Sequence, residues 1–393
     1  MAKILVYGLS ALTDGHISLY KRLNEMGESI TILYSSSDRC PSINNDLSIV
    51  RLSSNILKKL KQVFSIVNNE KPVIVEFYLH DFSRKGALFE LIILMLCRFK
   101  NINTTVICTG REILNFSEHS FLKRASIKLH LHNSKYFLIK ELYMRKQISE
   151  LNIADTRKCL FVHNGVDDAL SKVNIKSDKK IVLFFNSFKK WRNVPFLVDC
   201  AISLTKIRED VIFLIVGARN ESEINQATDL LSACDQNIKD RIQVMKMSNN
   251  KSLFLGLADL FVLPADIVWL NNSILEAMSS EVCVLLPNLP GSNLIIEDQV
   301  SGFIHEHLNK EDFINKVNYI FSMDESSISE VKSNAKLRVR KIFGVKKRAI
   351  LHKRFHEVII SDTENLEFGL YTDTFDHLKS EEEVLSRLGS IKC

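Results

Sequence analysis

The sequence predicts an α/β protein built from two doubly wound domains. Short apolar runs alternate with longer segments whose apolar residues recur at helical spacing. The apolar runs are continuous, which is typical of parallel strands covered by helices on both faces. A polar, lysine-rich stretch at 170–180 separates two such series. The length of 393 residues is enough for two or three domains.

The strands of the first domain are expected at 3–8, 29–35, 72–78 and 104–110. Those of the second are expected at 179–187, 211–217, 242–247, 260–264 and 283–287. Helical patterns such as 18–27 and 193–207 lie between them. We therefore expect domains at 1–170 and 171–340, then a helix that crosses back to the first domain and an acidic tail, 341–393. Such domains bind ligands at the carboxyl ends of their strands, here in the cleft where the two domains face each other.

Composition narrows the function classes. Hydrophobic residues make up 46% and charged residues 25%, as in ordinary globular proteins. The net charge of +6 permits an anionic ligand or a membrane surface but does not require nucleic acid. None of the eight cysteines forms a Cys-x-x-Cys pair, which indicates reduced thiols in a cytoplasmic protein. We expect neither a signal peptide nor a membrane-spanning helix, since the most apolar segment, 86–99, is too short.

A glycine-containing loop follows the first strand. Gly8 and Gly15 are the only glycines there, so the dinucleotide fingerprint is incomplete and a nicotinamide or flavin cofactor is disfavoured. The loop is either a simple turn or a ligand contact. We place Gly8, Gly15 and His16 among the candidate acceptor or cleft residues, together with His80 at the end of a later strand.

The remaining histidines do not favour a metal site. His130 and His132 have the spacing of a strand with both rings on one face, but no acid or cysteine pair accompanies them. The chain also has no Asp-x-Asp triplet, which would hold a divalent cation in single-domain sugar transferases. We therefore expect no metal and no cofactor.

A basic loop follows the first strand of the second domain. Lys189, Lys190 and Arg192 lie where a phosphate would sit, and could neutralise a diphosphate leaving group. The alternative is a solvated basic loop. Asn186 and Ser187 in this loop, with Gly217 at the end of the next strand, are also candidate ligand contacts.

A carboxylate follows the strand at 260–264. Asn272 or Ser273 is expected to cap the next helix, and Glu276 to stand in its first turn. The free N–H groups there form an anion site. Glu276 either complements the helix dipole or accepts hydrogen bonds from two sugar hydroxyl groups.

The order of several segments resembles the family 4 glycosyltransferases of the GT-B fold. The resemblance covers most of the second half and is weaker in the first half, where strand order and the glycine turn agree. Asn164 lies in a stretch that resembles the family's hinge motif. The resemblance implies a nucleotide-sugar donor, a retaining transfer without metal, and a Glu276 that binds the donor ribose. The segments that carry it are 163–168, 182–201, 211–220, 258–264, 273–288 and 295–304.

The sequence departs from the family in several places. Val268 stands where the first acid of the family's acidic pair belongs, and Asp266 is the nearest substitute. Ser187 and Arg192 occupy the positions of the diphosphate-binding Arg and Lys. Arg111 and Glu112 replace a His-Asp pair. We assign catalytic roles to Lys190, Arg192, Asp266 and Arg111, and donor binding to Glu276, Lys189, Asn186, Ser187, Gly217, Asn272 and Ser273.

We accordingly predict a glycosyltransferase that moves a sugar from a nucleotide donor onto a glycan or lipid-linked acceptor in surface polysaccharide or glycoconjugate synthesis. It would lie in the cytoplasm, on the inner face of the cell membrane. The segments 83–100 and 332–358 combine apolar and cationic residues, and are either lipid-binding or ordinary core and solvated helices. The altered site leaves a catalytically inactive subunit that supports a partner transferase as the alternative. A nucleotide-sugar epimerase ranks third, because no acid–base pair of carboxylates is identified.

Overall fold

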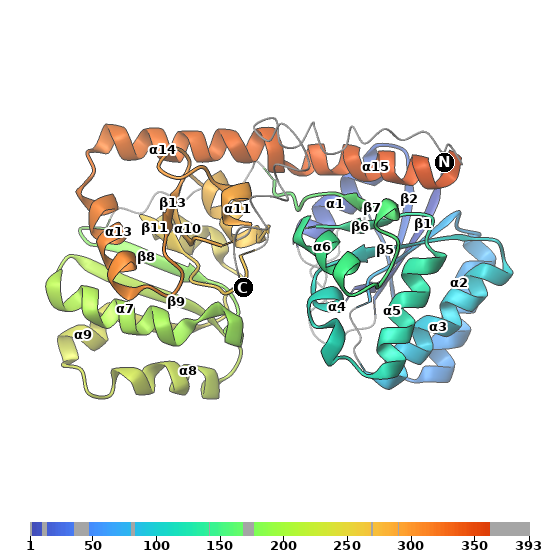
Figure 1. The fold of residues 1–393 in the computed structure, drawn as a ribbon, viewed down its shortest axis with the longest axis horizontal. Helices are drawn as coiled ribbons and strands as arrows, with labels where there is room; N and C mark the ends of the chain where they lie inside the picture. Colours follow the sequence, from blue (N-terminus) through green and yellow to red (C-terminus); the bar gives the residue numbers. More distant parts are fainter. Residues whose placement is uncertain are drawn as a thin grey trace. The chain divides into compact units, whose positions relative to one another are not determined.

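The computed structural model describes residues 2–9, 14–34, 47–79, 83–140, 142–167, 177–268, 270–289 and 291–361. It divides into two compact units (Figure 1). The first contains the described residues up to Gly165 and the helix from Val345 onward, and the second runs from Val166 to Gly344. The predicted domain boundary at 170 and the acidic tail lie outside the described residues.

The first unit contains a parallel sheet of seven strands in the order β3-β2-β1-β4-β5-β6-β7. The four predicted strands of this half form β1, β2, β4 and β5; the shorter β3, β6 and β7 were not predicted. The prediction of a strand around His130 and His132 is wrong, because both residues lie in helix α5. The strands are β1 (Lys3–Leu9), β2 (Ser29–Tyr34), β3 (Ser48–Arg51), β4 (Ile74–Phe77), β5 (Asn103–Cys108), β6 (Phe137–Ile139) and β7 (Cys159–Phe161).

Helices cover both faces of this sheet. Figure 1 shows α1 and α15 on one side of the strands and α2, α3 and α5 on the other. Helix α15 comes last in the chain, yet it packs on α1 and β4 of the first unit. The helices are α1 (Asp14–Glu25), α2 (Ile56–Glu70), α3 (Arg84–Phe99), α4 (Arg111–Leu114), α5 (Phe121–Asn133), α6 (Leu142–Glu150) and α15 (Val345–Ser361), with 3-10 turns η1 (Phe116–Glu118) and η2 (Thr156–Lys158).

The second unit contains a parallel sheet of six strands in the order β10-β9-β8-β11-β12-β13. Its five predicted strands form β8 to β12, and β13 was not predicted. The strands β11 and β12 are buried at every residue, as expected of parallel strands covered on both faces. The strands are β8 (Lys180–Phe185), β9 (Val211–Ala218), β10 (Ile242–Lys246), β11 (Leu260–Val262), β12 (Cys283–Pro287) and β13 (Phe303–His305).

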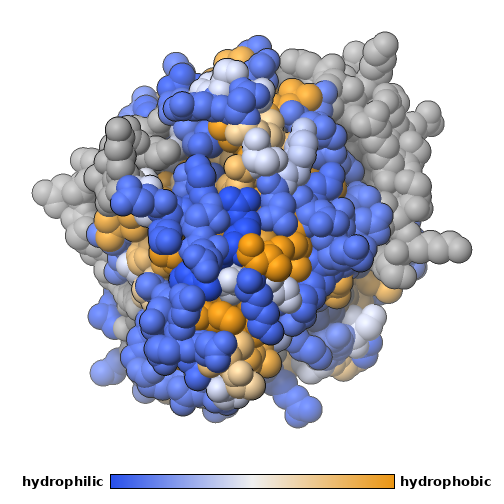
Figure 2. All heavy atoms as spheres, turned by 90° about the vertical axis from the view of Figure 1, so that its left-hand side faces the viewer, coloured by the Kyte–Doolittle hydropathy of each residue, from blue (hydrophilic) through white to orange (hydrophobic). Residues whose placement is uncertain are grey.

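The helices of the second unit follow its strands in alternation. Figure 2 shows the face on the side of α7, α8 and α13, which is mostly hydrophilic with separate hydrophobic patches. The helices are α7 (Val194–Ile207), α8 (Glu221–Thr228), α9 (Gln236–Arg241), α10 (Lys251–Leu257), α11 (Asn272–Ser279), α12 (Ser292–Ile295), α13 (Lys310–Ser322) and α14 (Glu325–Arg338), with 3-10 turns η3 (Lys190–Arg192) and η4 (Asp229–Leu231) and the π-helical turn η5 (Val339–Phe343). Among the described helices of the whole chain, none is both long and apolar enough to cross a membrane.

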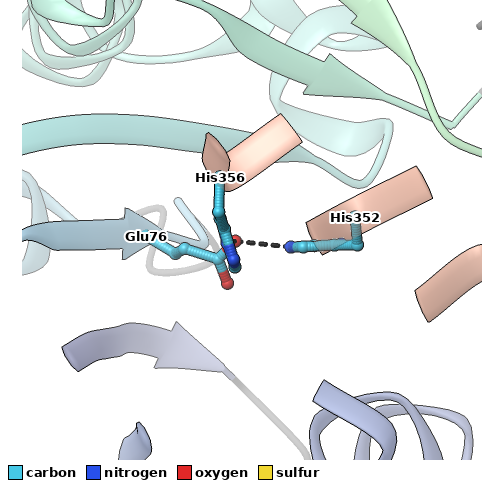
Figure 3. Close-up of side chains that lie close together, drawn as sticks. All are labelled: Glu76, His352 and His356. Atoms are coloured by element: carbon cyan, nitrogen blue, oxygen red, sulfur yellow. Dashed lines mark hydrogen bonds and ion pairs between the residues drawn. The ribbon is translucent and has the colours of Figure 1, made fainter. Parts of the chain in front are cut away.

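A buried group of acids and histidines fixes α15 to the first unit (Figure 3). His352 Nε2 lies 2.6 Å from Glu76 Oε1, and His356 Nε2 lies 2.9 Å from the same oxygen. His356 Nδ1 lies 2.9 Å from Glu28 Oε1, and the hydroxyl of Tyr20 donates to Glu76 Oε2 at 2.8 Å. Because β4 supplies Glu76 and the residue before β2 supplies Glu28, one helix is bonded to two places in the first unit.

The charges in this group stabilise one another. Burial alone would lower the pKa of His356, but its hydrogen bonds to Glu28 and Glu76 raise it to about 9. Burial alone would raise the pKa of Glu76, but the charge and hydrogen bonds of His352 and His356 hold it below its usual range. Burial lowers the pKa of His352, so we assign the positive charge to His356. The group is therefore an imidazolium between two carboxylates.

Replacing His356 with Gln should destabilise the protein by about 3–5 kcal/mol, because two buried carboxylates lose their cation. The raised pKa of His356 gives stability that is complete below about pH 6.5, its unfolded pKa, and that falls as the pH rises through about 9. The lowered pKa of Glu76 gives stability that is present above about pH 4.5 and is lost as the pH falls. Urea unfolding at several pH values should thus give a maximum near pH 5–6.5, and the decline toward pH 9 should be weaker in His356→Gln. An equal decline in both proteins would contradict this account.

Candidate functional site

Two loops meet at the carboxyl edge of the second sheet, after the adjacent strands β8 and β11. The amide of Asp266 donates to the carbonyl of Trp191 at 2.9 Å. Arg192 Nη1 donates to the carbonyl of Ile267 at 3.1 Å, and Asn193 Nδ2 donates to Asp266 Oδ1 at 2.6 Å. These three bonds hold the basic loop and the loop before α11 in one arrangement.

Helix α11 begins one residue earlier than predicted. Asn271 is the N-cap, and its side-chain oxygen accepts from the amide of Ser273 at 3.0 Å and from its hydroxyl at 2.7 Å. The expected caps, Asn272 and Ser273, are instead the first two residues of the helix. Glu276 consequently stands in the second turn rather than the first, and complementing the helix dipole is a weak account of it.

Asn186 connects the end of β8 to the start of α11. Its Nδ2 donates to Ser273 Oγ at 3.0 Å, and its Oδ1 accepts from the amide of Ser187 at 2.9 Å. Gly217 lies against the same turn with a φ of +152°, and a Cβ there would overlap the carbonyl of Asn186. A larger residue would therefore displace the Asn186 turn, so Gly217 has a positioning role that its sequence position alone did not show.

Glu276 is a nearly buried carboxylate with a cationic partner. It is 8% exposed, and its Oε1 accepts from Lys251 Nζ at 2.7 Å. Lys251 is the first residue of α10, and we did not predict it from the sequence. The two residues of this ion pair are 25 positions apart, so no periodic pattern in the sequence indicates it. The one local signal is that a lysine begins the helix before β11. The lysine offsets the charge of Glu276 and fixes the orientation of the carboxylate.

The three predicted cations of the basic loop have different surroundings. Lys189 Nζ lies 5.2 Å from the centre of the Trp191 ring, and Lys190 is exposed. Arg192 is buried, and burial lowers its pKa to about 10. Its Nη1 donates a hydrogen bond to the carbonyl of Ile267, while its Nε has no hydrogen-bond partner among the described residues.

Val268 stands where the resembled family has the first acid of its acidic pair, and its surroundings in the structure are apolar. Val268 is completely buried and belongs to the core. Asp266, the predicted substitute, is exposed, and besides Asn193 it lies 3.3 Å from His307 Nε2. Asp266 therefore holds the basic loop in place, and its catalytic role remains a prediction.

The predicted residues of the first unit lie near its carboxyl edge. Gly8 has a φ of +90°, and a Cβ there would overlap the carbonyl of Tyr78. The carbonyl of Gly15 accepts a 3.5 Å bond from Arg348, and the ring of His16 packs edge-on against Tyr78. Asn164 is half-buried, and its carbonyl lies 2.7 Å from His163 Nδ1. Arg111 is the first residue of α4, and His80 lies outside the described residues.

Glu112 is used locally at the start of α4. Its Oε1 accepts from the amides of Thr109 and Gly110, and its Oε2 accepts from the Thr109 hydroxyl. Burial raises its pKa despite these donors. The carboxyl thus closes the turn after β5, and no described contact assigns it a role with a substrate.

Among the described residues, Glu76, His352 and His356 are the group whose donor atoms could share a metal ion. The two nitrogen atoms lie at hydrogen-bond distance from one carboxylate oxygen, and all three side chains are buried. Two ligand atoms on zinc, each about 2.0–2.2 Å from it, would have to move apart. The group is complete as an ion network, so it carries no metal assignment here.

A hollow of about 580 Å³ lies at the other edge of the first sheet. Its lining includes Val73, Phe99, Lys100, Asn103 and Ile360, and it contains neither an acid nor a histidine. Its lining therefore offers no carboxylate or imidazole for acid–base chemistry.

The chain is similar to known proteins over its second unit and over most of its length. Residues 179–323 match the family model described as "Glycosyl transferases group 1". Over 344 residues, 78% of this chain and 80% of the relative, the chain is 25% identical to the UDP-Gal:alpha-D-GlcNAc-diphosphoundecaprenol alpha-1,3-galactosyltransferase of Escherichia coli. The matched family segment contains both loops and helix α11.

Solved structures share the fold. Sucrose-phosphate synthase from Thermosynechococcus elongatus superposes with a TM-score of 0.78 at 12% identity, covering 92% of this chain and 100% of that one. HepE from Anabaena, solved with UDP and glucose, gives 0.73 at 13% identity, covering 91% and 99%. A glycosyltransferase from Rickettsia africae gives 0.70 at 17% identity, covering 92% and 99%. At these identities the likeness establishes the two-sheet GT-B architecture.

Proposed function

Because this chain is a glycosyltransferase of the GT-B fold, we propose that it transfers a sugar from a nucleotide-sugar donor to a lipid-linked acceptor. The donor binds at the carboxyl edge of the second unit, and the first unit holds the acceptor. The relative from Escherichia coli is named for a lipid-diphosphate acceptor, which supports this acceptor class and a place in surface polysaccharide synthesis.

The observation that carries the donor assignment is the environment of Glu276. A carboxylate only 8% exposed stands beside the polar turn of Asn186 and the cap of α11. A carboxylate accepts hydrogen bonds from two hydroxyl groups, which suits the ribose of a nucleotide. Lys251 holds it in one orientation before the ligand arrives. The Glu276 carboxylate is thus held in place as a hydrogen-bond acceptor, which supports a role in binding a sugar diol.

The cations of the basic loop suit the diphosphate. Lys189 and Lys190 can neutralise the charge that develops on the leaving group, which is electrostatic stabilisation of the transition state. Arg192 mainly fixes the shape of that loop through the carbonyl of Ile267. With this charge supplied by lysines, we propose a retaining transfer that needs no metal.

The starts of α2 and α3 form a surface suited to anionic lipid. Ile56, Leu57 and Leu88 are 48%, 71% and 53% exposed. Lys59 Nζ lies 4.5 Å from the centre of the Phe89 ring, which places the two helix starts side by side. Basic residues interleave with the apolar ones, and this combination attracts negatively charged headgroups. These exposed basic residues are Lys58, Lys61, Arg84 and Lys85.

We propose that this surface holds the protein on the cytoplasmic face of the membrane. The predicted segment 83–100 contributes its first turns to this surface, and eight of the sixteen residues of α3 are buried in the core. In the basic segment 332–358, His352 and His356 are buried in the ion network of α15, whereas Arg340, Lys341, Lys346 and Arg354 are exposed.

Glu276→Gln should remove nucleotide binding while leaving the fold intact. A nucleoside diphosphate at 100 times its dissociation constant adds about 2.7 kcal/mol of stability, which a thermal shift detects. A panel of nucleoside diphosphates should shift the wild type and the control Glu311→Gln equally, and Glu276→Gln little. The control replaces an exposed carboxylate on α13. An unchanged shift in Glu276→Gln, or none in the wild type, would remove the donor assignment.

Transfer should continue in excess EDTA, because lysines rather than a cation neutralise the leaving group. The rate should change less than about twofold, and the product should keep the anomeric configuration of the donor when followed by proton NMR. A rate abolished by EDTA and restored by magnesium would show that a metal is required. An inverted product would exclude the retaining mechanism.

The double substitution of Leu57 and Leu88 by Ser should reduce binding to vesicles that contain phosphatidylglycerol. Loss of two exposed leucines removes about 1.5–3 kcal/mol of apolar burial each if they insert fully. Co-sedimentation measures the bound fraction, with pure phosphatidylcholine vesicles as the uncharged reference. Phe99→Ser is the control, since Phe99 is 87% exposed at the other end of α3. An equal loss of vesicle binding in the double variant and in the control would contradict the proposed lipid-binding surface.

A further inference from the structure

Arg348 is a buried cation with very few partners. It stands in the first turn of α15 and is only 3% exposed. Its described hydrogen bond is a long one, from Nη1 to the carbonyl of Gly15 at 3.5 Å, and its Nε has no partner among the described residues. A guanidinium has five N–H donors, and burying it without acceptors is costly. Among the described residues, no anion satisfies this guanidinium.

Lys140 is a second cation at the same edge. It directly follows β6, its side chain is half-buried, and its Nζ lies 5.9 Å from the centre of the Tyr78 ring. Burial, followed by the charge of Arg348, lowers the pKa of Lys140 to about 7. The ring of His16 also packs against Tyr78, with 5.7 Å between the two ring centres. Tyr78 thus contacts both a half-buried lysine and a half-buried histidine, and Arg348 bonds to Gly15, the residue before that histidine.

The nearby carboxylates are already occupied. Glu76 receives hydrogen bonds from Tyr20, His352 and His356, and Glu112 receives them from the turn after β5. In the part of the chain that the structure describes, no carboxylate forms an ion pair with Lys140 or Arg348 within 4.0 Å. The described neighbours of Lys140 and Arg348 therefore leave their positive charge without a paired carboxylate.

We infer that Lys140 and Arg348 form a phosphate-binding subsite at the carboxyl edge of the first unit, with His16 at its rim. A planar guanidinium presents paired N–H groups to phosphate oxygens, and an ammonium adds a point charge. A diphosphate supplies enough oxygen atoms to satisfy both side chains. Resting on the proposed function, we assign this subsite to the diphosphate of a lipid-linked acceptor rather than to that of the donor.

The subsite is tested first with inorganic pyrophosphate and the full chain. Isothermal titration should show binding that weakens about 10- to 100-fold in Lys140→Met, since a charge-assisted contact is lost. Arg348→Lys keeps the positive charge but removes the paired N–H groups of the guanidinium, so it should also weaken the binding of pyrophosphate. Arg354→Met is the control, because it removes an exposed arginine from the same helix. Circular dichroism confirms that each variant is folded.

Kinetics then separate the two sources of diphosphate. For the acceptor, Lys140→Met should raise the KM for a short-chain lipid diphosphate sugar about tenfold and leave the KM for the nucleotide sugar unchanged. The reverse pattern would overturn the assignment to the acceptor. Pyrophosphate binding that is equal in the wild type and Lys140→Met would overturn the subsite itself. This binding does not depend on turnover, so its result stands apart from the Glu276 test of the donor site.

Discussion

The contact between α15 and the first sheet is the constraint on which the first unit depends. His356 lies between Glu28 and Glu76, and His352 bonds to the same oxygen of Glu76. Removing one member of such a group leaves a buried charge without its partner, which costs far more than losing an exposed ion pair. Because α15 follows the whole second unit in the chain, one face of the first sheet is completed only by residues from the far end of the sequence.

Helix α15 also carries Arg348, the residue that we assign to phosphate binding. Its first turn places Arg348 at the carboxyl edge of the first sheet, and its later turns insert the two histidines beneath it. A residue anchored in this way loses little conformational entropy when a ligand binds, since its position is set before binding. The buried ion network therefore acts as the support of the edge at which we place the acceptor's phosphate.

Hydrogen bonds between side chains and loops shape the carboxyl edge of the second unit. Asn186, Asn271 and Ser273 bond to one another and shape the turn beside Glu276. The bonds between the basic loop and the loop at 266–267 commit Arg192 to structure, while Lys190 on the same loop is exposed. Val268 is part of the core, so the acidic position of the resembled family has been converted to packing. The chain thus keeps cations and one carboxylate at the edge where we place the nucleotide diphosphate, without the second acid.

The sequence by itself determined the fold class and indicated the region in which we place the donor. Continuous apolar runs identified nine of the parallel strands, and the family resemblance pointed to Glu276 and the basic loop, because both signals are local in sequence. The short β3, β6, β7 and β13 were not found, because β3 has no buried residue and the other three have only three residues each. The equally short β11 was found because Leu263 and Pro264 extend its apolar run. The histidines of α5 were misassigned because a spacing of two suits a strand only when tertiary packing agrees. Only the tertiary structure decided the pairing of Glu276 with Lys251, the buried ion network and the isolated charge of Arg348, because each depends on side chains brought together from distant parts of the chain.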